Sequence, residues 1–281
     1  YTEFVSADGL ANEKGREVLI KDFRFKKNEH PIVAQIFGAN PENIKKAAIL
    51  VRELGFDGID INMGCPDKAV IKQGAGSALI KNPKLAREII RAAKEGAGGL
   101  PVSVKTRIGF NKNEIETWLP EILAEKPSAL IVHLRTKKEM SEVPAHWEFA
   151  GQIAKMAKEA GVILIGNGDV ESLEDGIQKA KDSGVDGIMV GRGIFGNPWF
   201  FNEKKKIQDI SLEEKLETMI QHAKLFEKEL SGIKGFHIMR KHFKAYISGF
   251  DGAKELRAKF METNNVKEVE DIVKEYLKKG V

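Results

Sequence analysis

Residues 58–66 read GIDINMGCP and hold the pattern that decides the fold: a short apolar run, Gly58–Met63, that leads straight into a polar turn with glycine and proline. Similar apolar, β-branched runs recur at Tyr1–Val5, Pro31–Phe37, Val102–Arg107, Ala129–Leu134, Val162–Gly166 and Gly187–Val190. Amphipathic segments lie between them at Pro41–Leu54, Asn82–Glu95, Trp147–Ala160 and Ser172–Ser183. Alternation of short strands with helices predicts a parallel α/β sheet.

Polar residues and glycines gather at the ends of at least five of these predicted strands. In a (β/α)8 barrel the carboxyl ends of all strands converge on one face, where active sites form. A doubly wound sheet would instead gather its ligand at one switch point. We therefore predict an α/β fold of the (β/α)8 TIM-barrel type, although seven strands are predicted rather than eight.

From about Lys204 the pattern changes to helices without intervening strands. The predicted helices are Ser211–Leu230, Gly235–Ile247, Gly252–Met261 and Lys267–Lys279. This predicts a barrel domain over residues 1–203 and a small all-α bundle over 204–281.

Residues 204–281 hold 17 Lys and Arg against 13 Asp and Glu, which is the whole net charge of +4. A basic terminal module suits an anionic partner such as RNA, but a solvated lysine-rich helical surface explains the same count.

Composition excludes several classes of protein. No apolar run approaches the ~20 residues of a membrane helix, and the N-terminus lacks the features of an export signal. A single cysteine, Cys65, excludes an internal disulfide framework and a cysteine zinc cluster. We expect a cytoplasmic protein without a metal.

Cys65 is the first candidate for chemistry. Most lone cysteines are small buried hydrophobes. Its place after a predicted strand, between Gly64 and Pro66, makes a functional thiol as well supported as a structural one, and such a thiol could act as a nucleophile or as a general acid.

Basic side chains follow the next two strands. Period-two alternation places Lys105 and Arg107 on one side of their strand, towards the barrel axis, where a lysine needs an anion or a carbonyl. His133 ends the following strand and is either a satisfied core histidine or a functional one. The basic residues after it, Arg135, Lys137 and Lys138, suit phosphate groups at the barrel mouth.

Two glycine-containing turns end the last two strands. Asn167-Gly168-Asp169 and Gly191-Arg192 are in register with successive strands. In barrels this neighbourhood often binds phosphate, through backbone N–H groups and a helix N-terminus. Together the turns predict a cofactor that carries a phosphate.

These residues together resemble the tRNA-dihydrouridine synthase family. The segments Asn62–Val70 and Gly74–Leu79 are similar to the family's signature. Gln35, Lys105, His133 and the two glycine turns follow in family order, and Arg240–Tyr246 resembles part of the family's helical RNA-binding domain. The resemblance covers nearly the whole chain.

The resemblance implies an FMN enzyme that takes electrons from NADPH and reduces a uridine in tRNA. Hydride would pass from flavin N5 to uracil C6, and Cys65 would donate a proton to C5. The residues implied to hold the cofactor are Gln35, Lys105, His133, Asn167, Gly168, Asp169, Gly191 and Arg192. Those implied to bind substrate are Asn62, Arg107, Arg135, Lys137, Lys138, Arg240 and Lys241.

The chain departs from the family pattern at three places. It begins at what would be the second strand, which accounts for the count of seven and predicts weakened flavin binding. Leu134 follows His133 where the family usually has glycine, and His146 replaces an aspartate.

Two other functions fit part of the sequence. Another FMN barrel, similar to dihydroorotate dehydrogenase and acting on a free pyrimidine, would not need the basic tail. A tRNA-binding protein without catalysis would have the tail but no turnover. We expect a monomer; the tRNA position and the preference for NADPH over NADH stay open.

Overall fold

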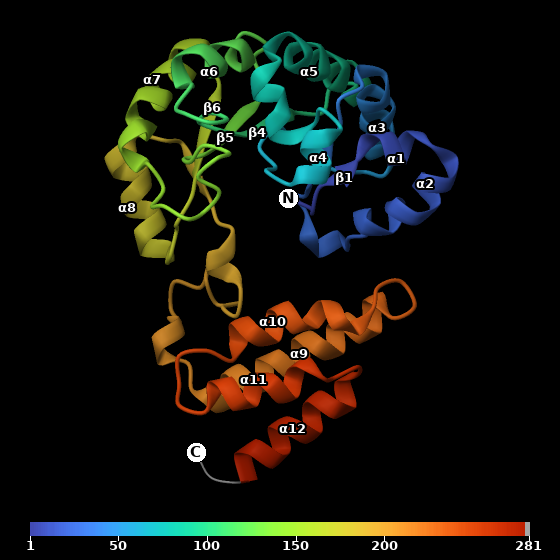
Figure 1. Cartoon of the computed structure of the whole chain (residues 1–281), viewed down its shortest axis with the longest axis vertical. Coiled ribbons are helices and arrows are strands. Elements are labelled where there is room, and N and C mark those ends of the chain that lie inside the picture. The colour runs from blue at the N-terminus through green and yellow to red at the C-terminus, as the bar shows by residue number, and fades with distance from the viewer. Residues whose placement is uncertain (279–281) are drawn as a thin grey trace. The chain divides into compact units, whose positions relative to one another are not determined.

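The structure is a computed structural model that describes residues 1–278 and divides into two compact units (Figure 1). The strand unit comprises Tyr1–Asp169 and Glu174–Val190, and the helical unit comprises Val170–Leu173 and the chain from Gly191 onward. Residues 191–203 thus group with the helices, whereas the predicted boundary lies at 203/204. The physical reason is that Phe195 in this segment stacks on His242 of the helical unit.

Seven parallel strands form one sheet in the order of the chain, as the sequence predicts. They are β1 Val5–Ser6, β2 Val33–Phe37, β3 Gly58–Asn62, β4 Val102–Arg107, β5 Ala129–His133, β6 Ile163–Asn167 and β7 Gly187–Met189. The register pairs Asn62 with Lys105, Arg107 with His133, and His133 with Asn167, so the predicted site residues end adjacent strands at one level.

The predicted strand Tyr1–Val5 is wrong except for its last residue, which begins the two-residue strand β1. The chain turns into a helix directly afterwards, because the Ser6 hydroxyl accepts a hydrogen bond from the backbone N–H of Gly9 and caps the helix that follows.

Helices surround the outer face of the sheet (Figure 1). They are α1 Ala7–Ala11, α2 Glu13–Leu19, α3 Pro41–Glu53, α5 Pro83–Ala97, α6 Ile115–Leu123, α7 Ala150–Ala160 and α8 Leu173–Ser183, while the short helix α4 Lys68–Lys72 lies in the segment after β3, where Val70 packs with Cys65. Asn40 and Asn82 cap α3 and α5 through their side-chain oxygens, as the sequence predicts. The apolar faces of α3 and α5 lie against each other, and Gly96 permits the contact because a Cβ there would lie 2.4 Å from the Lys45 carbonyl oxygen.

The helical unit contains α9 Leu212–Leu230, α10 Arg240–Tyr246, α11 Ala253–Met261 and α12 Val266–Lys278. Ser211 caps α9 by accepting a hydrogen bond from the N–H of Glu214. The core of this unit is apolar and aromatic, built around residues such as Met219, Phe243 and Phe260. Within residues 1–278, no helix combines the length and apolar character needed to span a membrane.

Candidate active site

A buried chain of hydrogen bonds joins the first strands of the site. Asp60 accepts hydrogen bonds from Ser103 Oγ and Gln35 Nε2, each at 2.6 Å. Asn62 Nδ2 donates in turn to Gln35 Oε1 at 2.9 Å. Burial raises the pKa of Asp60. This chain fixes the side chains of Gln35 and Asn62 in one orientation.

Asp60 was not among the predicted site residues. The sequence carries a signal for it, since an acidic residue inside an otherwise apolar strand must find partners when it is buried. Asp60 and Asn62 are two residues apart and therefore lie on the same face of β3.

Asn62 also shapes the turn that holds the cysteine. Its Oδ1 accepts hydrogen bonds from the backbone N–H groups of Gly64 at 3.1 Å and Cys65 at 2.9 Å. A side chain at Gly76, which has a φ of +59°, would place its Cβ 2.9 Å from the Cys65 carbonyl oxygen. The turn therefore depends on a close approach that only glycine allows.

The Cys65 thiol lies at the edge of the protein interior, with 9% of the residue exposed. Burial raises its pKa, and the charge of Arg107 opposes that rise. A thiol with a raised pKa keeps its proton at neutral pH, which suits a general acid better than a nucleophile.

Lys105 crosses the interior of the strand unit from β4 to β6. Its Nζ donates to Asn167 Oδ1 at 3.1 Å, and Asn167 Nδ2 donates to the Met189 carbonyl oxygen at 2.8 Å. Burial lowers the pKa of Lys105 to about 8. Lys105 and Asn167, predicted together as cofactor ligands, are thus in direct contact.

Arg107 braces the cysteine turn against the loop after β5. Its Nε donates to the Gly64 carbonyl oxygen at 2.8 Å, and its Nη1 donates to the carbonyl oxygens of Thr136 and Met140 at 3.0 Å each. Burial lowers the pKa of Arg107 to about 10. These contacts make Arg107 a support for the Cys65 turn, and its predicted contact with substrate stays a prediction.

His133 is a neutral imidazole. Burial, together with the nearby charges of Arg107, Lys105 and Arg135, lowers its pKa to about 2. Its Nε2 lies 3.4 Å from Arg135 Nη1, which can only donate, so Nε2 is the acceptor and Nδ1 carries the proton. That Nδ1 is buried and has no hydrogen-bond partner among residues 1–278. An unsatisfied buried N–H group marks a place where a ligand could accept a hydrogen bond.

Arg135 and Asp169 fasten two loops together. Arg135, only 2% exposed, forms an ion pair with Asp169 and donates from Nε to the Val143 carbonyl oxygen at 2.6 Å. Asp169 also accepts from the N–H of Ala145 at 2.9 Å. Both residues are engaged inside the strand unit, so their predicted contacts with substrate and phosphate stay predictions.

The turn after β6 has the backbone of a tight loop. Gly168 has a φ of +130°, and a Cβ there would lie 2.8 Å from that of Ala145. Its carbonyl oxygen accepts a hydrogen bond from Trp147 Nε1 at 2.9 Å. Gly191 and Arg192 belong to the helical unit, so the two predicted halves of the phosphate site lie in different units.

The two residues that depart from the family pattern both have partners. Leu134 is buried in the core of the strand unit. His146 contacts Glu139 at 3.0 Å and Glu148 at 2.9 Å. Although burial lowers the pKa of His146, hydrogen bonds to these two carboxylates raise it overall.

Cations and an aromatic ring from the segments after β3, β4 and β5 lie close together. Lys81 Nζ lies 3.8 Å and Lys137 Nζ 5.2 Å from the centre of the Phe110 ring, while Lys138 is exposed. Lys137 and Lys138 were predicted, whereas Lys81 and Phe110 were not, because they are distant in sequence. Arg240 and Lys241, also predicted, begin α10 in the helical unit.

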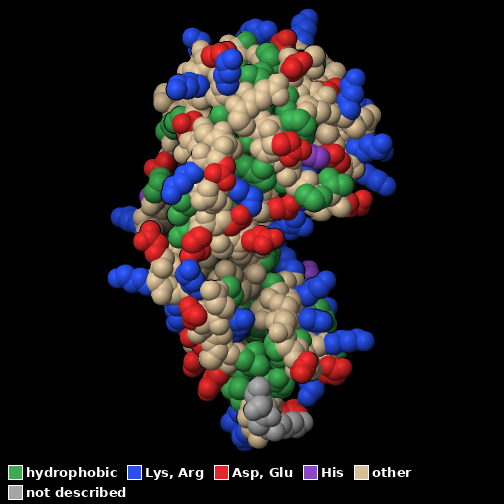
Figure 2. Space-filling view, turned by 90° about the vertical axis from the view of Figure 1, so that its left-hand side faces the viewer, with side chains coloured by type: hydrophobic (Ala, Val, Ile, Leu, Met, Phe, Trp, Pro, Cys, Tyr) green, Lys and Arg blue, Asp and Glu red, His purple; other side chains and the backbone are tan. Residues whose placement is uncertain are grey.

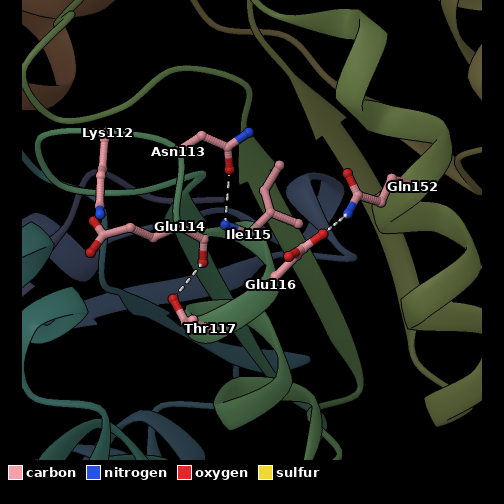
Figure 3. Close-up of a pocket in the computed structure, with 7 residues that line it drawn as sticks. All are labelled: Lys112, Asn113, Glu114, Ile115, Glu116, Thr117 and Gln152. Carbon is pink, nitrogen blue, oxygen red and sulfur yellow. Dashed lines mark hydrogen bonds between the residues drawn. The ribbon is translucent and has the colours of Figure 1, made fainter.

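A separate surface pocket of about 350 Å³ lies where α6 begins (Figure 3). Its polar groups are already paired: Asn113 Oδ1 accepts from the N–H of Ile115 at 2.9 Å, and Gln152 Nε2 donates to Glu116 Oε1 at 3.3 Å. Its lining includes neither Cys65 nor any of the interior polar residues described above. In the part of the chain that the structure describes, no group of three His, Cys, Asp or Glu side chains could hold a metal ion.

Comparison with known proteins gives a consistent result. A family model described as dihydrouridine synthase matches residues 1–280. A probable tRNA-dihydrouridine synthase of Staphylococcus aureus is 40% identical over 280 residues, which cover 98% of this chain and 84% of that protein. A probable tRNA-dihydrouridine synthase 2 of Bacillus subtilis is 41% identical over 283 residues, covering 99% and 86%.

Among solved structures the likenesses are weaker and partial. Morphinone reductase matches with a TM-score of 0.42 at 18% identity, covering 57% of this chain and 46% of that one. An old yellow enzyme homologue from Zymomonas mobilis matches with a TM-score of 0.42 at 19% identity, covering 60% and 53%.

Proposed function

The chain belongs to the dihydrouridine synthase family, and we propose that it is a tRNA-dihydrouridine synthase that uses FMN and NADPH to reduce the C5=C6 bond of a uridine in tRNA. The observation that carries the proposal is the arrangement of Cys65, Lys105 and His133 at the ends of adjacent strands. A protonated thiol, a partly buried cation and an unsatisfied N–H group lie within one strand unit.

The interior of the strand unit offers groups that suit a flavin. His133 Nδ1–H lacks an acceptor, and the ring nitrogens and carbonyl oxygens of a flavin are acceptors. Lys105 is buried beside Asn167 and is costly there unless it meets negative charge, which a reduced flavin has. When bound, FMN would supply the hydride chemistry that no amino-acid side chain can provide.

The remaining predicted cofactor ligands divide into two groups. Gln35 is held in place by Asp60 and Asn62 and can present its amide to the flavin edge. For the ribityl phosphate we retain Asn167, Gly168 and Asp169 of the strand unit, while Gly191 and Arg192 stay predictions from the sequence.

The role of Cys65 is to supply the proton. Reduction of the C5=C6 bond adds a hydride equivalent, drawn from NADPH, at C6 and a proton at C5. Burial keeps the thiol protonated at neutral pH, and the Asn62-shaped turn holds it at the end of β3. The thiolate that remains then takes a proton back from solvent.

The residues proposed to bind substrate have different roles. Asn62 and Arg107 border the cysteine turn and would position the uracil ring. Lys137, Lys138, Arg240 and Lys241 would meet phosphate groups, which makes binding sensitive to salt. We assign Arg135 a positioning role, because it holds His133 and Asp169 rather than facing outward.

Visible absorbance tests the function directly. The protein, supplied with FMN, should show the bands of an oxidised flavin, lose them when NADPH is added without oxygen, and regain them when an unmodified tRNA transcript follows. A matched tRNA that already carries dihydrouridine is the control and should restore less colour.

Three outcomes would contradict the proposal in different ways. A protein that binds tRNA but stays colourless with added FMN would be an RNA-binding protein without catalysis. A reduced flavin reoxidised by a free pyrimidine and not by tRNA would indicate the dihydroorotate dehydrogenase-like function. A protein that binds neither would exclude all three functions.

A further inference from the structure

A second pocket, of about 540 Å³, lies wholly within the helical unit and shares no residue with the site described above. Its lining comes from the segment after β7 and from α9 and α10, and is mostly apolar. The volume is within the about 300–1,000 Å³ of pockets that hold small organic groups.

Flat rings dominate the wall of this pocket. Phe195 and His242 are nearly parallel, with their ring centres 5.5 Å apart and an angle of 15° between the planes. His222 meets His242 edge to face at 4.7 Å. Phe195 is 43% exposed and Phe201 is 65% exposed, so ring surface remains open to a partner.

Polar groups lie among these rings. Burial lowers the pKa of His222, which favours the neutral imidazole, and its Nδ1 lies 3.4 Å from the Tyr246 hydroxyl. Asn197 also lines the pocket, and its buried Oδ1 accepts no hydrogen bond from any residue between 1 and 278. The pocket thus combines π surfaces with a few hydrogen-bonding groups, as a nucleobase itself does.

A basic segment of the chain contributes to the pocket. Residues 230–250 contain the four cations Lys234, Arg240, Lys241 and Lys244 and no Asp or Glu. This segment includes α10, which contributes His242 and Tyr246 to the pocket. Elsewhere charges of both signs are interspersed, as the face in Figure 2 shows. Lys241 Nζ lies 6.0 Å from the centre of the Phe195 ring. An aromatic pocket with a cation beside one of its rings is complementary to a base that is joined to phosphates.

We propose that this pocket binds an unstacked nucleobase of tRNA, stacked against Phe195 and Phe201, with the adjoining phosphates near α10. The inference rests on the proposed function, because it takes tRNA as the RNA. It adds a second holding point for the RNA, on the helical unit, besides the uridine that is reduced. Stacking on aromatic side chains is tolerant of sequence, so the pocket would contribute affinity more than base identity.

Stacking and phosphate contacts respond differently to salt, and this separates them in an experiment. Affinity for an unmodified tRNA transcript is measured by fluorescence anisotropy over a range of salt concentrations. The double variant Phe195→Leu/Phe201→Leu keeps apolar bulk and removes two π surfaces. We expect it to weaken binding about tenfold with no change in the salt slope, because stacking releases no counterions.

A matched variant and a second probe complete the test. Phe195→Tyr keeps the ring and should bind tRNA within about twofold of the parent protein. A short single-stranded RNA that carries 2-aminopurine reports stacking by fluorescence quenching, which the double variant should lose. The single variant Phe201→Leu, at a largely exposed position, replaces the double variant if thermal melting shows that the latter is unfolded.

The outcomes are distinguishable. Unchanged tRNA affinity and unchanged quenching in the leucine variants would overturn the nucleobase pocket while leaving the proposed function intact. A loss of affinity that comes with a lower salt slope would also overturn it, because the pocket would then act through phosphates. A parent protein that does not bind tRNA would instead remove the proposed function itself.

Discussion

The strand unit buries polar side chains, and the helical unit buries almost none. Ten buried polar or charged residues, among them Asp60, Arg107 and Arg135, lie in the strand unit, whereas Thr263 is the single one in the described part of the helical unit. The core of the helical unit is built from residues such as Leu216, Phe243 and Val269.

This difference shows where each unit places its charges. In the strand unit, Lys105 and His133 are partly buried, so their protonation depends on burial and on nearby charges. In the helical unit most lysines lie at the surface, where salt screens them. We therefore expect pH to act mainly on the strand unit and salt mainly on the contacts of surface lysines with RNA.

The largest expected effect is on catalysis in the strand unit. Cys65→Ala removes the proposed proton donor and should slow the return of flavin colour with tRNA by more than about 100-fold, the range of general acid catalysis. Reduction by NADPH should stay at the parent rate, since it needs no proton from Cys65. Cys65→Ser, which keeps a weak acid of similar size, is the control; an alanine variant as fast as the parent would show that another group donates the proton.

The second largest effect is expected on the stability of the helical unit, when a residue of its apolar core is shortened. Phe243 is fully buried, so Phe243→Ala should cost about 3–5 kcal/mol of stability. Hydrogen exchange followed by mass spectrometry should show lost protection in α9–α12 and normal protection in the strand unit. Phe201→Ala, at an exposed position, is the comparison and should change the exchange little. Equal loss of protection in both units would mean that they unfold as one.

The third effect is a gain in stability when the charge of Lys105 is removed. Burial lowers the pKa of Lys105 in the folded protein to about 8, below the ordinary 10.5. Below pH ~8 the side chain is therefore charged in the folded protein, and the burial of this charge lowers stability. The folded state therefore loses this proton first, and stability should rise between pH 8 and 10.5. Lys105→Met should stabilise the flavin-free protein at pH 7 by about 3 kcal/mol and lose that advantage near pH 10.5.

Urea unfolding at pH 7 and pH 10 measures this difference. Lys244→Met, which alters an exposed lysine of α10, is the matched control and should show no such gain. The same Lys105→Met variant should bind FMN more weakly. A variant that is less stable than the parent at pH 7 would show that the Lys105–Asn167 contact outweighs the cost of burial.

A smaller effect concerns His133 in acid. The folded pKa of about 2 lies below the ordinary 6.5. Below pH 6.5 the unfolded chain therefore binds a proton at His133, whereas the folded protein does not. This contribution destabilises the protein progressively as the pH falls below 6.5, by about 2 kcal/mol at pH 5. His133→Asn should lose this part of the pH dependence, as read from thermal melting between pH 5 and 7.5.

His146 gives the opposite trend and serves as the control. Its folded pKa is raised, so it contributes stability below its ordinary pKa that is lost as the pH rises through the folded value. His146→Asn should therefore cost stability at pH 5 and little at pH 8. Identical pH profiles for the parent and His133→Asn would contradict the burial of a neutral His133.

The smallest effect is expected on the surface of the helical unit. Lys244→Gln should weaken tRNA binding by only a few fold and lower the slope of log affinity against log salt by about 1. Stability should change by less than about 0.5 kcal/mol, because Lys244 is exposed. Lys254→Gln on α11 is the matched control; an equal effect there would mean that RNA binding is not concentrated on α10.

Local patterns in the sequence were sufficient to predict most elements. The strand Val102–Arg107 and the helix that starts at Pro41 are where period and capping signals place them, because those signals act over a few residues. The helix Ile115–Leu123 was not predicted, since it is short and contains Pro120. The segment Tyr1–Val5 was predicted as a strand from its composition, but only Val5 belongs to strand β1, and Ser6 caps a helix that begins at Ala7.

The sequence alone determined the parallel strands, the helical C-terminal region and the position of Cys65, Lys105, His133 and Asn167 at strand ends. Only the tertiary structure decided which of them meet. The ion pair of Arg135 with Asp169, the support of Cys65 by Arg107 and the stack of Phe195 on His242 join residues that are 34 or more positions apart. The spacing of apolar residues along the chain indicates which face of a helix or strand is buried. Contacts between distant residues depend instead on the register of the strands and on the paths of the loops, which local sequence patterns do not determine.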